Sequence, residues 1–403
     1  MTGEILFLAH RVPFPPDRGD KIRSHHLLRH LASLAPVHVG CFADDARDLD
    51  QLAALDAAAS SRMVVLRDKA LPVAGIAALA RGLPVSLTAF ASQPLTKWVA
   101  RTLAGRPIGA IVVFSGQMGQ YIPDDYAGCV IVDLCDVDSA KFDAYAEHAP
   151  AWRRWIDQRE GQLLAREEAR LAARADATVL ISEPEAELLR SRLPQRTSAR
   201  LAVIGNGIDT AVFDPAQATP HPALAGASGP HIVFTGQMDY PPNVAAVEKT
   251  ASAILPLIRR ACPSAVFHIV GRAPTAAVRK LAGDGVRVWG EVPDVRPFLA
   301  AADIVIAPLA LARGVQNKVL EAMAMARPVV LTRGAATGIA AKAGADFAVA
   351  DSDAELAKAV ISLLAAPDKA AAMGRSARNF VVARHGWDAM LAPLGALLEQ
   401  LVR

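Results

Sequence analysis

The chain has 403 residues, of which 52% are hydrophobic and 21% are charged, and its formal net charge is +3. This length predicts two or three domains, and the composition is typical of a globular protein rather than of one that binds nucleic acid. The four cysteines are scattered without a CxxC pair, which favours reduced thiols over a disulfide framework. Glu4 interrupts the first apolar run, and no run reaches the roughly 18 residues of a membrane span, so we expect a cytoplasmic protein.

The first predicted strand, Glu4 to Ala9, is followed by a proline-rich loop and by a helix that begins after Gly19 and runs to about Ala35. Gly19 permits close approach of a ligand to the backbone at the helix N-terminus. Basic residues outnumber acidic ones around this point. The loop is therefore a candidate ligand site, with candidate residues Arg18, Gly19, Asp20 and Lys21.

Strand-like runs alternate with helical segments, which predicts an α/β fold with parallel sheets. The runs form two series: 37–42, 63–66, 110–114, 130–134, 177–181 and 201–204, then 231–235, 265–270, 286–289, 304–307, 329–332 and 347–349. A turn followed by a Pro- and Ala-rich stretch through Pro230 is typical of a linker between them. We predict two doubly wound, Rossmann-like domains facing each other across a cleft, namely residues 1–205 and 206–385. The last helical segment, 386–403, fits either domain on its pattern.

The tripeptide Asp136-Val137-Asp138 follows a predicted strand and looks like the Asp-x-Asp manganese site of one class of sugar transferases. A tripeptide is too short to be specific, and acidic residues also start helices. Asp138 or Ser139 would cap a helix from Ala140. We favour the helix start, which predicts no metal site and leaves Asp136 as an acid near the ligand.

A charged helix is predicted from Trp152 to Arg174. Its charges are of mixed sign, which favours a solvated helix face. Trp and Arg side chains at its start, including Arg153, also suit a membrane surface. Together with the basic residues near Lys21, they are candidates for a peripheral contact with the inner membrane.

Residues 302–331 predict a strand, a loop, a helix and a second strand. Asn317 is a good N-cap, and residues 318–326 are strong helix formers. The loop and the helix N-terminus then lie at the carboxyl ends of parallel strands, where such sheets bind ligands. Lys318 suits a diphosphate and Glu321, on the same helix face, suits ribose hydroxyls, although an ordinary i,i+3 ion pair explains the same two residues.

Several segments of the second half are similar to segments of glycosyltransferase family 4, the retaining GT-B transferases: IGNGIDTAVF (204–213), FTGQMDYPPN (234–243), FHIVG (267–271) and VWGEV (288–292). The resemblance extends over nearly the whole chain. It implies a GT-B fold and transfer of a hexose from a nucleotide-diphosphate sugar with retention, without a metal or another cofactor. The implied donor-binding residues are Gly236, Asn243, Gly271, Glu291, Val292, Gly314, Val315, Gln316, Asn317, Lys318 and Glu321.

Residues 9–21 (AHRVPFPPDRGDK) and 132–139 are similar to a subfamily of sugar transferases associated with PEP-CTERM exopolysaccharide systems. This resemblance implies a lipid-linked glycan as acceptor, and it places Arg18, Gly19, Asp20 and Lys21 on the acceptor side.

Two positions depart from the family pattern. Glu321 matches the second glutamate of the family's E-x7-E pair, but the first position is Arg313. Residues 237–239 (QMD) replace the family's Arg and Lys after the first strand of the donor domain. We expect Arg313 and Lys318 to supply the missing positive charge and to stabilise the departing diphosphate. The predicted catalytic residues are Lys318, Arg313 and Asp136.

Two other functions remain open from the sequence. A UDP-sugar 2-epimerase shares the two-domain fold, but it needs a general acid/base set, and the family 4 segments argue against it. A transferase-like binding protein that lost catalysis together with the first glutamate is the non-enzymatic alternative.

Overall fold

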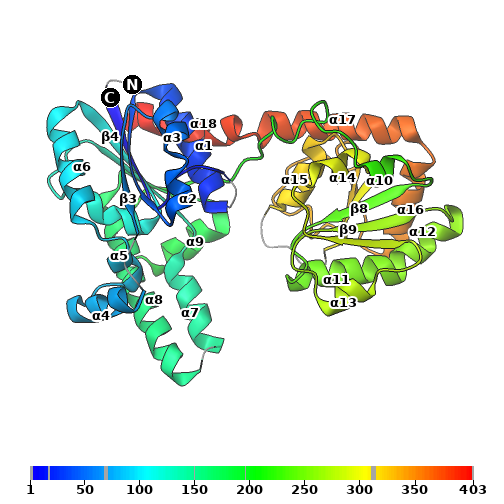
Figure 1. Cartoon of the computed structure of the whole chain (residues 1–403), viewed down its shortest axis with the longest axis horizontal. Helices are drawn as coiled ribbons and strands as arrows, with labels where there is room; N and C mark the ends of the chain where they lie inside the picture. The colour runs from blue at the N-terminus through cyan, green and yellow to red at the C-terminus, as the bar shows by residue number, and fades with distance from the viewer. Residues whose placement is uncertain are drawn as a thin grey trace. The chain divides into compact units, whose positions relative to one another are not determined.

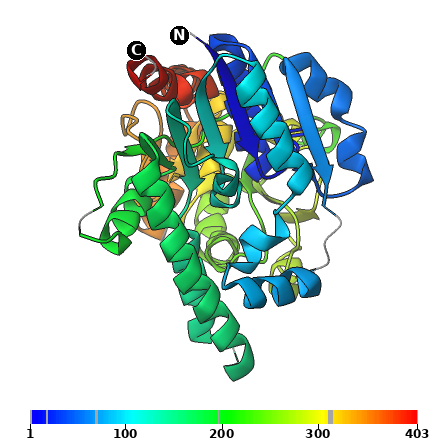
Figure 2. The ribbon, with the colours of Figure 1, turned by 90° about the vertical axis from the view of Figure 1, so that its left-hand side faces the viewer.

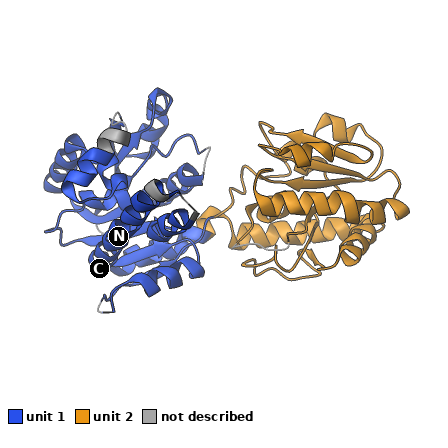
Figure 3. Ribbon diagram, turned by 90° about the horizontal axis from the view of Figure 1, so that it is seen from below, with its two compact units in different colours: residues 1–206, 390–403 blue, residues 207–389 orange. Residues whose placement is uncertain are grey.

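The computed structural model describes residues 3–16, 19–67, 71–148, 150–195, 197–309 and 315–401, with the side chains of 71–74, 148, 151 and 152 outside this description. The chain divides into two compact units: residues 1–206 with 390–403 form unit 1, and residues 207–389 form unit 2 (Figure 3). Each unit is an α/β domain built on one parallel sheet, so the predicted fold class is confirmed.

In the described part of unit 1, seven parallel strands form a sheet in the order β3-β2-β1-β4-β5-β6-β7. Strands such as β1 are apolar and buried on both faces, as expected when helices cover both sides of a parallel sheet. The strand bounds are β1 Glu4–Ala9, β2 Val37–Ala43, β3 Ser61–Leu66, β4 Ile108–Phe114, β5 Cys129–Cys135, β6 Ala177–Leu180 and β7 Leu201–Val203.

Helices connect these strands and pack on both faces of the sheet. Leu6 and Leu8 of β1 pack in one core cluster with Leu95 and Val99 of α6, and α1 lies on the opposite side of the sheet (Figure 1). Ser92 caps α6 by accepting a hydrogen bond from the backbone N–H of Leu95. The helices are α1 Gly19–Leu34, α2 Ala46–Leu49, α3 Leu52–Ala58, α4 Leu71–Arg81, α5 Val85–Ala89, α6 Gln93–Gly105, the 3-10 helix η1 Gly116–Tyr121, α7 Asp138–His148, α8 Ala151–Arg174, α9 Glu183–Arg192 and α18 Trp387–Leu401.

Within residues 207–309 and 315–389, six parallel strands form the sheet of unit 2 in the order β10-β9-β8-β11-β12-β13. Its core is continuous and includes buried residues of all the longer helices of the unit. The strands are β8 His231–Thr235, β9 Val266–Val270, β10 Val286–Gly290, β11 Ile304–Ala307, β12 Val329–Leu331 and β13 Ala348–Val349. The helices are α10 Pro222–Ala225, α11 Pro241–Lys249, the π-helix η2 Thr250–Ile254, α12 Leu255–Ala261, α13 Ala276–Lys280, α14 Arg296–Ala301, α15 Asn317–Ala324, α16 Asp353–Leu364 and α17 Pro367–Arg384.

Each predicted strand is present, with ends that lie within two residues of the sequence-based bounds. The four cysteines are free thiols, as expected. Within the described ranges, no helix is both long enough and apolar enough to cross a bilayer.

Candidate functional site

The strand order of unit 2 reverses between β8 and β11, and this switch point holds most of the predicted donor residues. In open parallel sheets, ligands bind at the carboxyl ends of the strands where the order reverses. Gly236 follows β8 directly, Gly271 follows β9, and α15 begins shortly after β11. The sheet therefore brings three predicted segments to one edge.

The backbones of Gly236 and Gly271 are in direct contact. Gly271 has a φ of +151°, and a Cβ atom added there would lie 1.6 Å from the carbonyl oxygen of Gly236. Gly236 has a φ of +156° and donates its N–H to Val270 O at 3.0 Å. Only glycine fits this close approach, which leaves the backbone open toward the space above the strand ends.

Lys318 converges with two of the predicted donor residues. Its ammonium donates a hydrogen bond to Asn243 Oδ1, and Asn243 Nδ2 donates to Gln237 O at 2.8 Å. A Cβ atom at Gly236 would lie 3.0 Å from Lys318 Nζ. The ammonium is thus held by Asn243 beside the backbone of Gly236, in the turn formed by Gly236 and Gly271 (the glycine turn), as a phosphate-binding lysine requires.

Burial shifts the pKa values of Lys318 and Glu321 in opposite directions. Burial lowers the pKa of Lys318 to about 8, against the opposing effect of the Glu321 charge. Burial raises the pKa of Glu321 to about 7, against the opposing effect of Lys318. Both charged forms are poorly solvated, so an anion at Lys318 and hydroxyl donors at Glu321 would each compensate a desolvated charge.

The start of α15 differs from the predicted start. Asn317 is the first helical residue rather than the N-cap, which is Gln316 with an extended backbone and no side-chain capping bond. Gln316 O accepts the hydrogen bond from Val319 N at 2.9 Å and so closes the first turn. The predicted N-cap role of Asn317 is therefore wrong, and its side chain is exposed together with that of Val315. The helix also ends at Ala324 rather than Ala326.

Two predicted residues, Arg313 and Gly314, lie outside the described residues. Glu291 and Val292 follow β10, and the N–H of Gly271 donates to Gly290 O at 2.8 Å. Glu291 is exposed, whereas Val292 packs against the core of unit 2. The β10 segment therefore belongs to the same edge as the glycine turn.

Sequence reasoning missed Arg272, an exposed arginine directly after Gly271. Its guanidinium donates to Gln237 Oε1 at 2.9 Å, and its carbonyl accepts a hydrogen bond from Met238 N at 2.8 Å. A cation therefore reaches the loop in which the sequence lacks the family's Arg and Lys. The signal was present in the sequence as a basic residue after the second strand of the domain.

The strand order of unit 1 reverses between β1 and β4, and a cavity of about 490 Å³ lies at the carboxyl ends of these strands. The predicted residues Gly19, Asp20 and Asp136 line it. His10 and Arg11, which follow β1, line it too, and Arg11 Nη1 lies 2.5 Å from Asp20 Oδ2. These two residues were not singled out from the sequence.

Lys21 does not lie on the acceptor side as predicted. Its side chain is buried, and its ammonium lies 2.5 Å from Asp48 Oδ1 and donates to Phe14 O at 3.3 Å. The helix turns Lys21 inward because one face of α1 packs on the sheet. Its assignment as an acceptor or membrane contact is therefore corrected. Arg18 lies outside the described residues.

The segment with Asp136 and Asp138 is a helix start, but not by the predicted capping. The helix begins at Asp138, and Glu168 of α8 accepts hydrogen bonds from both N and Oγ of Ser139. Glu185 of α9 accepts the N–H of Val137 at 2.8 Å. Because carboxylates from other helices take these backbone donors, Asp136 and Asp138 remain available to other partners.

That partner is Lys141, whose ammonium lies 2.9 Å from Asp136 Oδ2 and 3.1 Å from Asp138 Oδ1. A protein cation therefore already stands between the two carboxylates. The same packing corrects the expectation for α8, whose acids Asp157 and Glu168 are buried rather than solvated.

Arg23 also lines the unit 1 cavity and is only 2% exposed. Its guanidinium lies 2.8 Å from Asp133 Oδ2 and donates to Ile204 O at 2.8 Å and to Asn206 Oδ1 at 2.9 Å. These contacts connect α1 and β5 to residues 204–206, where the first of the two segments of unit 1 ends.

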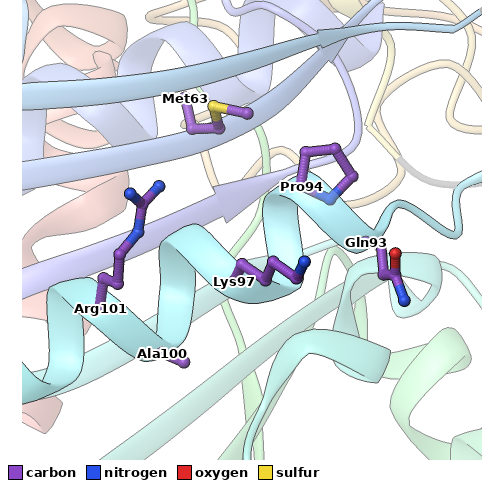
Figure 4. Close-up of a pocket in the computed structure, with 6 residues that line it drawn as sticks. All are labelled: Met63, Gln93, Pro94, Lys97, Ala100 and Arg101. Atoms are coloured by element: carbon purple, nitrogen blue, oxygen red, sulfur yellow. The ribbon is translucent and has the colours of Figure 1, made fainter.

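A larger hollow of about 560 Å³ lies between β3 and α6 (Figure 4). Met63 projects from the strand over α6, which contributes Lys97 and Arg101 to the lining. The hollow lies along the edge strand rather than at the strand ends, and it contains none of the predicted site residues. We therefore place the functional site of unit 1 at the smaller cavity.

Comparisons with known proteins agree with this geometry. Residues 229–366, which contain β8 to β13, match the family model described as glycosyl transferases group 1. The chain carries a glycosyltransferase domain. Alpha-maltose-1-phosphate synthase of Mycolicibacterium smegmatis is 28% identical over 235 residues, which are 53% of this chain and 60% of that protein. The match thus spans less than two thirds of the length of this relative.

Solved structures share the fold over the whole chain. HepE of Anabaena in complex with UDP superposes with a TM-score of 0.61 and 17% identity, over 99% of this chain and 100% of that one. WaaG, a glycosyltransferase involved in lipopolysaccharide biosynthesis, superposes with a TM-score of 0.59 and 17% identity, over 98% of both chains. Both likenesses show the fold, which is the two-domain α/β fold of GT-B glycosyltransferases.

Proposed function

We propose that this chain is a glycosyltransferase that moves a hexose from a nucleotide-diphosphate sugar to a glycan acceptor. The observation that carries the proposal is the convergence of Lys318, Asn243 and Gly236 at the switch point of the domain that matches the glycosyltransferase model. Lys318 would bind the diphosphate and Glu321 the ribose hydroxyls. HepE, which shares the fold, is solved with UDP and with UDP-glucose.

The finer chemistry is part of the same proposal. The family 4 resemblance supports transfer with retention, and Lys318 with Arg313 would stabilise the charge of the departing diphosphate. We propose that no metal is needed, because Lys141 already contacts the two carboxylates of the Asp136-Val137-Asp138 segment. Activity that survives EDTA would support this view, and loss that manganese restores would contradict it.

The acceptor would be a lipid-linked glycan in exopolysaccharide biosynthesis. The resemblance of residues 9–21 and 132–139 to the PEP-CTERM-associated subfamily supports this assignment. WaaG, of the same fold, is a glycosyltransferase involved in lipopolysaccharide biosynthesis. The cavity of unit 1 is the proposed acceptor site.

A thermal-shift screen of UDP-, GDP- and ADP-sugars tests the donor. A nucleotide sugar that binds the folded state at a concentration well above its Kd raises the Tm. Slow hydrolysis of that donor without an acceptor would then separate an enzyme from a binding protein, and the anomeric configuration of the transferred sugar by NMR would test retention. Absence of stabilisation by every nucleotide sugar would contradict the proposed function.

A cytoplasmic location at the inner membrane face is also proposed, through a surface on α4 and α8. The helices α7 and α8 pack together and project from the rest of unit 1 (Figure 2). Arg159 of α8 donates to Ala78 O and Leu83 O, so α4 lies beside α8. Ile76 is 71% exposed and Trp155 is 57% exposed, and Arg153, two residues before Trp155 in α8, is also exposed.

Exposed aromatic and aliphatic side chains beside arginines suit the interface of an anionic bilayer. The double change Ile76→Ser with Trp155→Ser should lower co-sedimentation with phosphatidylglycerol vesicles, and added salt should weaken binding of the parent chain. The matched control is Val382→Ser with Tyr240→Ser, which removes exposed apolar side chains of unit 2. Equal losses of vesicle binding in the two double variants would contradict the proposed location.

A further inference from the structure

The cavity of unit 1 is lined by charged groups that compensate one another. Among the described lining residues, the cations are Arg11, Arg23 and Lys141, and the carboxylates are Asp20, Asp136 and Asp138. Each of the cations is engaged: Arg11 with Asp20 at 2.5 Å and with Asp44 at 2.7 Å, Arg23 with Asp133 at 2.8 Å, and Lys141 with Asp136 at 2.9 Å and Asp138 at 3.1 Å.

An anionic ligand would compete with these carboxylates for the cations, and separating a pair would leave a partly buried carboxylate without its partner, which costs free energy. A cationic ligand faces the same difficulty with the paired carboxylates, because it must displace Lys141 or an arginine. Uncharged hydroxyl groups meet no such cost, since they accept hydrogen bonds from an ammonium and donate them to carboxylates without breaking the pairs.

Three aromatic rings also line the cavity. The ring centre of His10 lies 5.4 Å from that of Phe114 and 6.0 Å from that of Phe90, and all three residues line the cavity. Burial lowers the pKa of His10, so these rings are uncharged at neutral pH. The His10 ring is inclined by 35° to Phe114 and by 74° to Phe90, and its Nε2 lies 3.2 Å from Asp20 Oδ2 and 3.0 Å from Arg11 Nη1, so the aromatic rings adjoin the paired charges. Apolar ring surfaces beside hydrogen-bonding groups suit the apolar faces and the hydroxyl edge of a pyranose ring.

We propose that the acceptor sugar bound in this cavity is an uncharged hexose, and that the Lys141, Asp136 and Asp138 cluster excludes uronic acids and amino sugars. This inference rests on the proposed function, because it assigns the cavity to the acceptor. The cluster is fixed in place: Glu168 and Glu185 hold its backbone, so removing one charge leaves the others where they are. Lys141 is therefore a specificity-determining residue.

The test uses the full chain and methyl glycosides in the gluco, galacto and manno configurations, each as the neutral hexoside, the uronate and the 2-amino sugar. Binding is measured by saturation-transfer NMR and calorimetry, with and without saturating UDP. The parent chain should bind a neutral hexoside about tenfold more tightly than its charged counterparts, because each counterpart disturbs a partly exposed ion pair.

Two variants should change this selectivity in opposite directions. Lys141→Met leaves two carboxylates without their cation, so it should raise binding of the amino sugar relative to the neutral hexoside by about tenfold. The double change Asp136→Asn with Asp138→Asn should favour the uronate instead. The control is Lys249→Met in unit 2, because Lys249 lies 2.9 Å from Asp353 in a pair of similar exposure, and it should leave the selectivity unchanged.

A parent chain that prefers a charged hexoside, that binds no hexoside at all, or whose selectivity is unaffected by Lys141→Met would overturn the inference. Failure of the proposed function would be seen separately, as a lack of stabilisation by any nucleotide sugar, because the hexoside measurements require no transfer.

Discussion

The ammonium of Lys318 lies 4.6 Å from the centre of the Phe234 ring while it donates a hydrogen bond to Asn243. Phe234 belongs to β8 and Asn243 to α11, so two further elements fix a cation that α15 carries. The ring faces the cation with its negative π-surface and shields it from water. The lysine is thus oriented before a ligand arrives, which lowers the cost of binding an anion.

Replacing Lys318 should therefore act on the diphosphate. Lys318→Ala should weaken binding of the nucleoside diphosphate by about 10- to 100-fold, because a charged hydrogen bond contributes about 1.5–3 kcal/mol. Binding of the free nucleoside should change little. Calorimetry with both ligands measures the difference, and Lys358→Ala, on the exposed side of α16, is the control. Equal losses for the diphosphate and the nucleoside would refute the phosphate role.

The lowered pKa of Lys318 predicts a pH dependence of binding. Lysine must be protonated to pair with phosphate, and its pKa in the free protein is about 8. Diphosphate affinity should stay constant from pH 7 to about pH 8 and then fall by up to tenfold per unit as the ammonium loses its proton. Glu321→Gln removes the charge that raises this pKa, so it should move the midpoint to lower pH. Calorimetry across pH, which also detects proton uptake on binding, would contradict the prediction if the midpoint stayed near 10.5, the ordinary value for lysine.

The fold followed from the sequence because its signals are local. Apolar runs such as Ile304–Ala307 predict buried parallel strands, and this strand is buried in the sheet of unit 2. The donor residues Gly236 and Gly271 came only from the family resemblance, and the structure shows their backbones in close approach. The convergence of Lys318 with Asn243 required more than local pattern, but the βαβ order already placed both at strand ends.

The acceptor side was less predictable because the residues that form ion pairs and hydrogen bonds there are distant from one another in the sequence. Lys21 carries the same charge as Arg18 and Arg23 nearby in the sequence, and only the position of Asp48 shows that it points inward. In the same way, Glu168 replaces the expected cap on α7 from 29 residues away. Long-range carboxylate partners of this kind leave no periodic signal.

Arg23 and Asp133 should be strongly coupled in stability. Arg23→Ala leaves Asp133 buried without its cation, which should lower the free energy of unfolding by about 3–5 kcal/mol. The double change Arg23→Met with Asp133→Leu removes both charges and should recover part of that loss. Urea unfolding of the single and double variants measures the coupling. Additive losses in the double variant would show that the two residues act independently.

Arg313 stands at the position of the first glutamate in the family 4 pattern that the chain resembles, and its role remains a prediction from the sequence. If its fixed charge stabilises the leaving diphosphate, Arg313→Ala should lower kcat with a smaller effect on KM, because that charge grows in the transition state. Arg313→Glu should be worse than alanine, since it sets a like charge beside the phosphates. Steady-state kinetics with the donor varied separate these effects, and a fully active Arg313→Glu enzyme would rule the role out.

Arg272 is the structural candidate for the positive charge that residues 237–239 lack. Its guanidinium reaches Gln237 in the glycine turn next to Lys318, although it comes from the end of the neighbouring strand β9. Arg272→Ala should weaken diphosphate binding by about tenfold, as for a partly exposed charged contact, and it should reduce the dependence of binding on salt. Arg272→Lys should retain part of the affinity, because lysine keeps the charge but not the planar fork. The control is Arg375→Ala on the exposed face of α17, which should leave binding unchanged. If Arg272→Ala binds the diphosphate as the parent does, the side chain serves only to position Gln237, and the missing charge must come from Lys318 and Arg313.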